Sequence, residues 1–119
     1  MSREELNDKV NLALLCDFYG GLLTEKQRRV LSLHCEEDYS LGEIAEEVGI
    51  SRQAVHETLT RASARLRELE SVLGVAARFQ RVESGLELAL SALRQKNDDQ
   101  ARLLLEQLLA LETGGDHGL

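Results

Sequence analysis

The sequence lacks proline and tryptophan, and only four of its 119 residues are aromatic, two Phe and two Tyr. Because proline is absent, no position is barred from the interior of a helix by a missing amide proton. Because large aromatic side chains are so few, a core must be built from Leu, Val, Ile and Ala, which suits helices packed on helices. The composition therefore predicts an all-α protein, with one domain or one domain plus an appendage at this length.

Cysteine and histidine are scarce as well. Cys16 and Cys35 fall in predicted helices without a CxxC pattern, so we expect small buried side chains in a reducing compartment. His34, His56 and His117 are too far apart for metal-ligand spacing. The sequence also has no glycine-rich phosphate loop and no HExxH pattern. We therefore expect no metal, no cofactor and no enzymatic activity.

Long hydrophobic runs are missing too. Residues 1–15 mix charged and apolar side chains, which is unlike a signal peptide. No stretch approaches the roughly 18 apolar residues that a membrane-spanning helix needs. We expect a cytoplasmic protein.

Positive charge is in deficit, because the formal net charge is −7. A tight, free-standing nucleic-acid binder is usually basic, since phosphate neutralisation supplies most of its affinity. Any nucleic-acid-binding role must therefore rest on a local surface.

What the chain does contain is a clear set of helix boundaries. Three segments have the pattern of a capping box, in which a Ser or Thr and the residue three positions later bind each other's backbone amides. They are Ser2 to Glu5, Thr24 to Gln27 and Ser40 to Glu43. Ser51 is a further predicted cap. Glycines that can end helices are Gly20, Gly21, Gly49 and Gly74.

Between these boundaries, apolar residues recur at helical spacing. In the first three helices the predicted stripes are Leu6, Val10, Ala13, Leu14 and Phe18; then Gln27, Val30, Leu31, His34 and Cys35; then Leu41, Ile44, Ala45 and Val48. The fourth helix has a heptad seam of Val55, Leu59, Ala62, Leu66, Leu69 and Leu73. Its first half should pack on the second and third helices. Its second half, beyond Ala62, should need another partner.

The C-terminal part continues in the same pattern. A fifth helix is predicted from the seam Val75, Phe79, Val82, Leu86, Ala89 and Leu93. A sixth is predicted over 101–111 with Asn97 or Asp98 as its cap, the alternative being one continuous helix. The expected organisation is a four-helix domain over 1–73, a helical extension for dimerisation over 74–112, and a disordered tail over 113–119.

Residues 41–60 fit the pattern of a helix-turn-helix. With its cap and the next turn of the second helix, the predicted motif spans 40–65. Ile44, Val48, Ile50 and Val55 would form its shared core, and Gly49 would take the positive φ of the turn. The small Ala45 would let the second helix approach closely. An ordinary helical hairpin with the same spacing is the alternative.

In a helix-turn-helix, the N-terminal end of the second helix enters the major groove. With the seam facing inward, the outward residues that we predict to bind nucleic acid are Arg52, Gln53, His56, Glu57, Thr60, Arg61 and Arg65. An arginine such as Arg52 can bind guanine, and Gln53 can pair with adenine. Arg61 and Arg65 suit contacts to the phosphate backbone.

The local charge of this region favours nucleic-acid binding only modestly. Residues 51–73 carry four basic and three acidic side chains, whereas residues 1–50 carry five and eleven. The affinity of one subunit should therefore be weak and steeply salt-dependent, so that dimerisation or a partner protein must add to it. A solvated helix face of mixed charge is the alternative interpretation.

The sequence resembles the YlxM family of small bacterial helix-turn-helix proteins over residues 14–62, above all in the blocks DFYGGLLTEKQR and DYSLGEIAEEVGISRQAV. It is similar, more distantly, to the fourth region of bacterial sigma factors, which reads the −35 promoter element. Ser51, Arg52 and Val55 match the sigma recognition helix, whereas Ala54 and His56 stand where it has arginine. Promoter-like specificity is therefore not carried over. The resemblance covers the first 73 residues well and the remainder loosely.

The resemblance implies a sigma-region-four-like helical bundle that forms a homodimer. It also implies an accessory or regulatory role in the signal recognition particle pathway, with the GTPase or the RNA of that particle as a partner. The expected ligand is DNA or structured RNA. Alternatives are a protein-interaction adaptor that binds a targeting GTPase or RNA polymerase, and a DNA-binding transcription regulator.

We expect a dimer interface on the C-terminal seams. Its predicted residues are Leu66, Leu69, Leu73, Val75, Phe79, Val82 and Leu86. These stripes exceed what a small helical core can hide, and exposed apolar patches of that size usually mark an interface. An intrachain hairpin of the fourth and fifth helices is the alternative.

Overall fold

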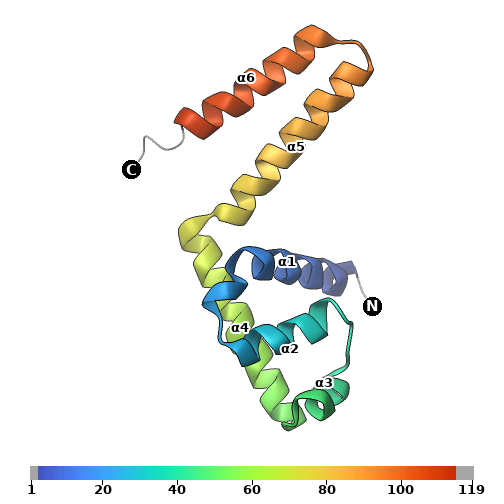
Figure 1. The fold of residues 1–119 in the computed structure, drawn as a ribbon, viewed down its shortest axis with the longest axis vertical. Helices are drawn as coiled ribbons and strands as arrows, with labels where there is room; N and C mark the ends of the chain where they lie inside the picture. The colour runs from blue at the N-terminus through green and yellow to red at the C-terminus, as the bar shows by residue number, and fades with distance from the viewer. Residues whose placement is uncertain (1–2, 115–119) are drawn as a thin grey trace. The chain divides into compact units, whose positions relative to one another are not determined.

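The computed structural model describes the backbone of residues 3–114 and the side chains of residues 11–111. Within that part of the chain there are six α-helices, one short 3₁₀ helix and no strand (Figure 1). The helices are α1 (Arg3–Tyr19), η1 (Gly20–Leu22), α2 (Glu25–Cys35), α3 (Leu41–Val48), α4 (Arg52–Leu73), α5 (Val75–Arg94) and α6 (Asp98–Gly114). The chain divides into two compact units, Met1–Ala76 and Ala77–Leu119. The prediction of an all-α helix-turn-helix bundle is confirmed.

The predicted helix starts are confirmed where the structure describes them. Thr24 caps α2, and its hydroxyl oxygen accepts the Gln27 amide at 3.1 Å while the Gln27 side chain accepts the Thr24 amide at 3.1 Å. Ser40 and Glu43 form the same reciprocal pair at the start of α3. Ser51 caps α4 by accepting the Ala54 amide at 3.0 Å. The predicted capping box at Ser2 lies outside the described residues.

The predicted helix ends are only partly confirmed. Gly49 and Gly74 end α3 and α4 with φ of 78° and 64°, in the left-handed region that glycine enters without steric cost. Gly20 and Gly21 do not take this conformation, which corrects our prediction for them. The chain instead tightens into η1, where the Leu23 amide donates to the Gly20 carbonyl at 3.1 Å. A 3₁₀ turn satisfies the end of the helix without a positive φ.

The predicted core of the helix-turn-helix is present. Ile44 of α3 and Val55 of α4 are completely buried together with Val30 of α2. Val48 and Ile50 are partly buried against this cluster. Helices α2, α3 and the first half of α4 are therefore held by one set of aliphatic side chains, and this set positions the face that α4 turns to solvent.

The second half of α4 has its partner inside the chain, which our sequence analysis did not foresee. Leu66 is fully buried in a second cluster that contains Leu12 and Tyr19 of α1. Leu69 is partly buried against the same cluster, whereas Leu73 is 54% exposed. Leu66 was predicted to lie on a dimer interface, and this is wrong because α1 covers it.

The buried face of α1 also differs from the predicted stripe. Leu12 and Tyr19 are buried, whereas Ala13, Leu14 and Phe18 are only partly buried. The side chains of Leu6 and Val10 lie outside the described residues. The difference arises because α2 and α4 together decide which face of α1 is covered, and spacing within α1 cannot identify those partners.

Tyr19 also anchors a partly buried polar network. Its hydroxyl donates to the Glu70 carboxylate at 2.5 Å and accepts the Val75 amide at 3.0 Å. The same Glu70 oxygen accepts the Ala76 amide at 3.0 Å. Two amides at the start of α5, which have no partner within their own helix, are satisfied in this way. Burial, and then the hydrogen bond to Glu70, raise the pKa of Tyr19.

In the C-terminal unit, α5 and α6 are separate helices, so the alternative of one continuous helix is wrong. Lys96 has φ of 61° in the connecting turn, and Asn97 caps α6 by accepting the Gln100 amide at 3.2 Å. Helix α6 begins at Asp98, three residues before the predicted start. It runs to Gly114, so residues 113 and 114 of the predicted disordered tail are helical. The rest of that tail, 115–119, lies outside the described residues.

Small residues let α5 and α6 approach each other closely. A Cβ atom added to Gly85 of α5 would lie 2.5 Å from Cδ2 of Leu108 in α6. Ala89, Ala92 and Ala101 are buried. Several leucines of both helices are nevertheless left exposed, because a pair of helices has too few layers to cover all its apolar faces. Among the described residues, no helix is both long and apolar enough to cross a membrane.

Candidate nucleic-acid interface

The candidate interface is built on the turn between α3 and α4. The Gly49 and Ile50 amides both donate to the Ala45 carbonyl, at 2.9 and 3.1 Å, which closes the end of α3. The Ser51 cap then starts α4 at once. Because Ile44 and Val55 lock the two helices together, the first turns of α4 present a fixed face to solvent.

All seven predicted nucleic-acid-binding residues are exposed on α4. They are Arg52, Gln53, His56, Glu57, Thr60, Arg61 and Arg65. The fold thus brings them together on one helix, and the core residues Val55 and Ala62 are turned the other way. Their exposure is what a reading face requires, although exposure alone does not select a ligand.

Most of these side chains keep their polar groups available. Within the part of the chain that the structure describes, no residue forms an ion pair or hydrogen bond with the guanidinium of Arg52 or Arg61. The same is true of the side chains of Gln53 and Glu57. A ligand could bind these groups without first displacing an intramolecular partner.

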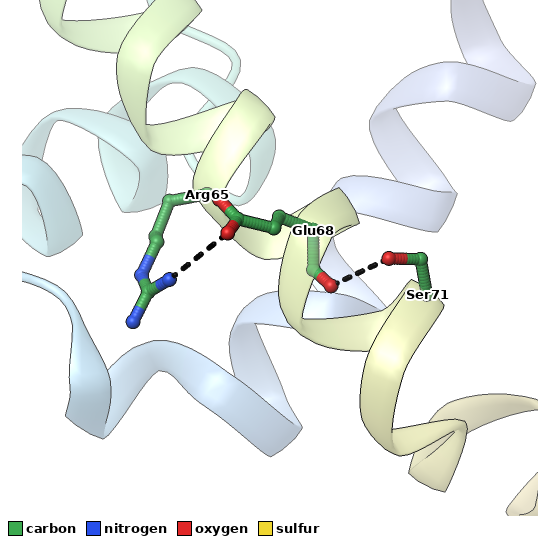
Figure 2. Close-up of polar contacts among 3 residues, drawn as sticks. All are labelled: Arg65, Glu68 and Ser71. Atoms are coloured by element: carbon green, nitrogen blue, oxygen red, sulfur yellow. Dashed lines mark hydrogen bonds and ion pairs between the residues drawn. The ribbon is translucent and has the colours of Figure 1, made fainter.

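Arg65 and Thr60 are less available. The Arg65 guanidinium lies 3.7 Å from the Glu68 carboxylate, one turn further along α4 (Figure 2). Both side chains are exposed, so this ion pair is weak and a phosphate could replace it. The Thr60 hydroxyl donates to the His56 carbonyl at 2.9 Å, and it can then only accept from a ligand. Ser71 likewise donates to a backbone carbonyl, that of Glu68 (Figure 2).

Acidic side chains adjoin this face on α3. Glu43, Glu46 and Glu47 are exposed, and Glu47 lies 3.8 Å from Arg29 of α2. The Ser40 backbone amide donates to Glu43 and lowers the pKa of its carboxyl, so that it is negative at neutral pH. These charges repel phosphates, which fits a surface of modest affinity.

The described residues also include side chains of the kinds that form metal sites and reactive thiols. Among them, no group of three or more His, Cys, Asp or Glu side chains is placed to hold a metal ion. Cys16 and Cys35 are partly buried and do not form a disulfide with each other, and burial raises the pKa of the Cys16 thiol. One feature of the site was not predicted from the sequence: Gly42 of α3 lies directly beside Arg52. Its only signal was a glycine inside a predicted helix.

Comparison with known proteins shows which family the sequence matches. Residues 6–107 match the family UPF0122, described as "Putative helix-turn-helix protein, YlxM / p13 like". The chain is 42% identical to a UPF0122 protein of Halalkalibacterium halodurans, over 90% of this chain and 99% of that protein. It is 44% identical to one of Symbiobacterium thermophilum, over 88% and 98%. It is 41% identical to one of Listeria innocua, over 85% and 94%. The match extends well beyond the 73 residues that carried the resemblance.

Proposed function

Because this chain belongs to the UPF0122 family of YlxM/p13-like helix-turn-helix proteins, we propose that it binds nucleic acid through the exposed face of α4. The nucleic acid is DNA or structured RNA, and the role is accessory or regulatory. A role in the signal recognition particle pathway is part of this proposal and rests on the family resemblance. A location in the cytoplasm, which we expected from the sequence composition, is part of it too.

One observation carries the proposal. Arg52, Gln53 and Arg61 are exposed on the second helix of an intact helix-turn-helix, and they have no polar partner among the described residues. The helix cap and the aliphatic core fix the backbone beneath them. Exposed donors on a fixed backbone suit the edges of bases and the oxygens of phosphates.

The test is direct binding of purified protein to two probes, a mixed-sequence DNA duplex and an RNA stem-loop, at several salt concentrations. Arg52→Ala with Arg61→Ala should weaken binding at least tenfold and reduce the salt dependence. Arg81→Ala with Arg94→Ala is the matched control, since it removes the same charge from exposed sites on α5. Equal affinity of the two double variants would contradict the proposal.

We further propose that the protein acts as a homodimer through its C-terminal unit. Leu86, Leu90 and Leu93 of α5 are each nearly half exposed and share one side of that helix by spacing. On the α6 side of the hairpin, Leu105 lies with Leu93 at the same groove of about 410 Å³. Two hairpins paired through these leucines would complete a four-helix bundle.

This placement moves the interface away from Leu66, which α1 covers, and keeps the predicted Leu86. Sedimentation equilibrium at micromolar concentration should give twice the chain mass, and Leu86→Arg should give the monomer mass. Ser84→Arg is the control, because it adds the same charge to an exposed position on α5 outside the leucine stripe. A monomer mass for the unaltered protein would refute the dimer.

An adaptor role is the second candidate, favoured by the acidic surface of the N-terminal unit. Glu36 and Glu37 after α2, and Glu46 and Glu47 on α3, are all exposed. A basic partner protein, such as a targeting GTPase or an RNA polymerase subunit, would suit this charge. Pull-down with Glu46→Lys and Glu47→Lys as the comparison tests it, and recovery of nucleic acid without any protein would argue against it.

A further inference from the structure

Gly42 is the second residue of α3, and nothing in its backbone conformation calls for glycine. Its φ is not positive, unlike that of Gly49 at the end of the same helix. In an eight-residue helix, a glycine within the first turn lowers helix stability relative to alanine. A different physical reason must favour a residue without a Cβ atom at this position.

The close approach of Arg52 supplies that reason. A Cβ atom at Gly42 would lie 2.7 Å from Nη2, 3.0 Å from Nε and 3.3 Å from Cζ of the Arg52 guanidinium. All three distances are shorter than ordinary van der Waals contact. The guanidinium therefore lies against the bare backbone of α3. By contrast, a Cβ atom at Gly49 would meet nothing within 4 Å, so the two glycines of the motif serve different purposes.

No direct ion pair within the described part of the chain accounts for the place of Arg52. The N-terminal end of α3 carries a partial positive charge, which disfavours a cation. Among the described residues none forms an ion pair with Arg52. Packing of the planar guanidinium on the peptide surface is the direct contact that the structure shows, and only a residue as small as glycine leaves room for it. An arginine side chain that is already confined loses less conformational freedom when it binds a ligand.

We propose that Gly42 is a positioning residue for nucleic-acid binding: by leaving the first turn of α3 bare, it holds the Arg52 guanidinium in place beside the start of α4. This inference rests on the proposed function, because it assigns a ligand-binding task to Arg52. It adds a position on the first helix of the motif that affects binding through Arg52, away from the predicted reading face.

The substitution Gly42→Ala separates this role from a structural one. An added methyl group displaces the end of a flexible side chain, and alanine favours the helix, so the thermal midpoint should be unchanged or higher. Affinity for the mixed-sequence DNA duplex or the RNA stem-loop should nevertheless fall by about three- to tenfold, which is up to about 1.4 kcal/mol. Gly21→Ala is the matched control, since it adds a Cβ atom where nothing lies within 4 Å.

A double-mutant cycle completes the test. If Gly42 acts through Arg52, Gly42→Ala should have no effect on affinity in an Arg52→Ala protein. Loss of affinity from Gly42→Ala in both backgrounds, or in neither, would overturn the inference. If Arg52→Ala itself leaves affinity unchanged, or the unaltered protein binds neither probe, the assignment of Arg52 in the proposed function fails first and the inference fails with it.

Discussion

The hydroxyl of Tyr19 in α1 donates a 2.5 Å hydrogen bond to the carboxylate of Glu70 in α4, 51 residues away in the sequence. The two side chains also accept the first amides of α5 from Val75 and Ala76. The N-terminal unit thus binds the chain at the point where α4 ends, through groups that are largely withdrawn from water.

Removing the Tyr19 hydroxyl should therefore destabilise the N-terminal unit. Tyr19→Phe keeps the ring in the core, leaves the Val75 amide without its acceptor, and removes the hydroxyl donor from Glu70. We expect a loss of about 1–3 kcal/mol in the free energy of unfolding, measured by urea denaturation. Tyr39→Phe, which alters the other tyrosine of the chain, is the control; an equal loss in both would show that the network around Glu70 contributes nothing specific.

The turn of the helix-turn-helix offers a test of backbone strain without steric overlap. Gly49 has φ of 78°, and a Cβ atom there would meet no atom within 4 Å. Gly49→Ala should cost about 1–2 kcal/mol, which is the penalty for an L-residue in the left-handed region. Gly49→Asn should cost less, because asparagine enters that region more readily. Chemical denaturation would rank the three proteins, and equal stability of all three would refute the argument.

The charged capping box at the start of α3 should make stability depend on pH. The Ser40 amide lowers the pKa of the Glu43 carboxyl in the folded protein, relative to its ordinary value of 4.5. The stabilisation is therefore present above about pH 4.5 and is lost as the pH falls through the lower, folded pKa.

Glu43→Gln keeps the geometry of this box but removes the charge. The unaltered protein should have the higher urea midpoint at neutral pH, and the difference between the two should vanish in acid. Glu46→Gln removes a charge from the same helix outside the cap and serves as the comparison. A difference in urea midpoint between the unaltered protein and Glu43→Gln that stays constant down to pH 3 would contradict the prediction.

In the C-terminal unit, the approach of α5 and α6 at Gly85 should not tolerate a side chain. Gly85→Ala would place a Cβ atom 2.5 Å from Cδ2 and 2.8 Å from Cγ of Leu108. Overpacking of this kind typically costs about 1–3 kcal/mol. Amide hydrogen exchange in α6 should accelerate, and Leu108→Ala should restore part of the protection in the Gly85→Ala protein. Ser84→Ala, at the neighbouring exposed position, should have little effect.

The sequence predicted local features of the fold well and long-range ones less well. Thr24, Ser40 and Gly49 were identified because a cap or a positive φ depends on residues only a few positions apart. The pairing of α1 with Leu66 was missed, because spacing along one helix does not reveal which other helix covers it. The end of α1 was also misjudged, since a double glycine permits a left-handed end but does not require one.

In the candidate interface, too, features that depend on local spacing were predicted and features that depend on packing between helices were not. Exposure of Arg52 and Arg61 followed from the helical phase of the apolar seam. The contact between Arg52 and Gly42 did not, because it depends on how closely α3 and α4 cross and on one rotamer. The ion pair between Arg65 and Glu68 makes Arg65 less available to a ligand. It could have been anticipated, because the two residues are three positions apart along α4.

The two clusters that flank α4 share one side chain. Leu59 is packed against both the cluster of Ile44 and Val55 and the cluster of Leu66 and Tyr19. Loss of order in either cluster therefore removes neighbours from Leu59 and weakens the packing of the other cluster. The N-terminal unit should open as a single cooperative element, with its slowest-exchanging amides in α1, α2 and α4 reporting one common free energy. A helix that presents a ligand face from such an element should not be loosened locally, so the face should stay ordered until the whole unit opens.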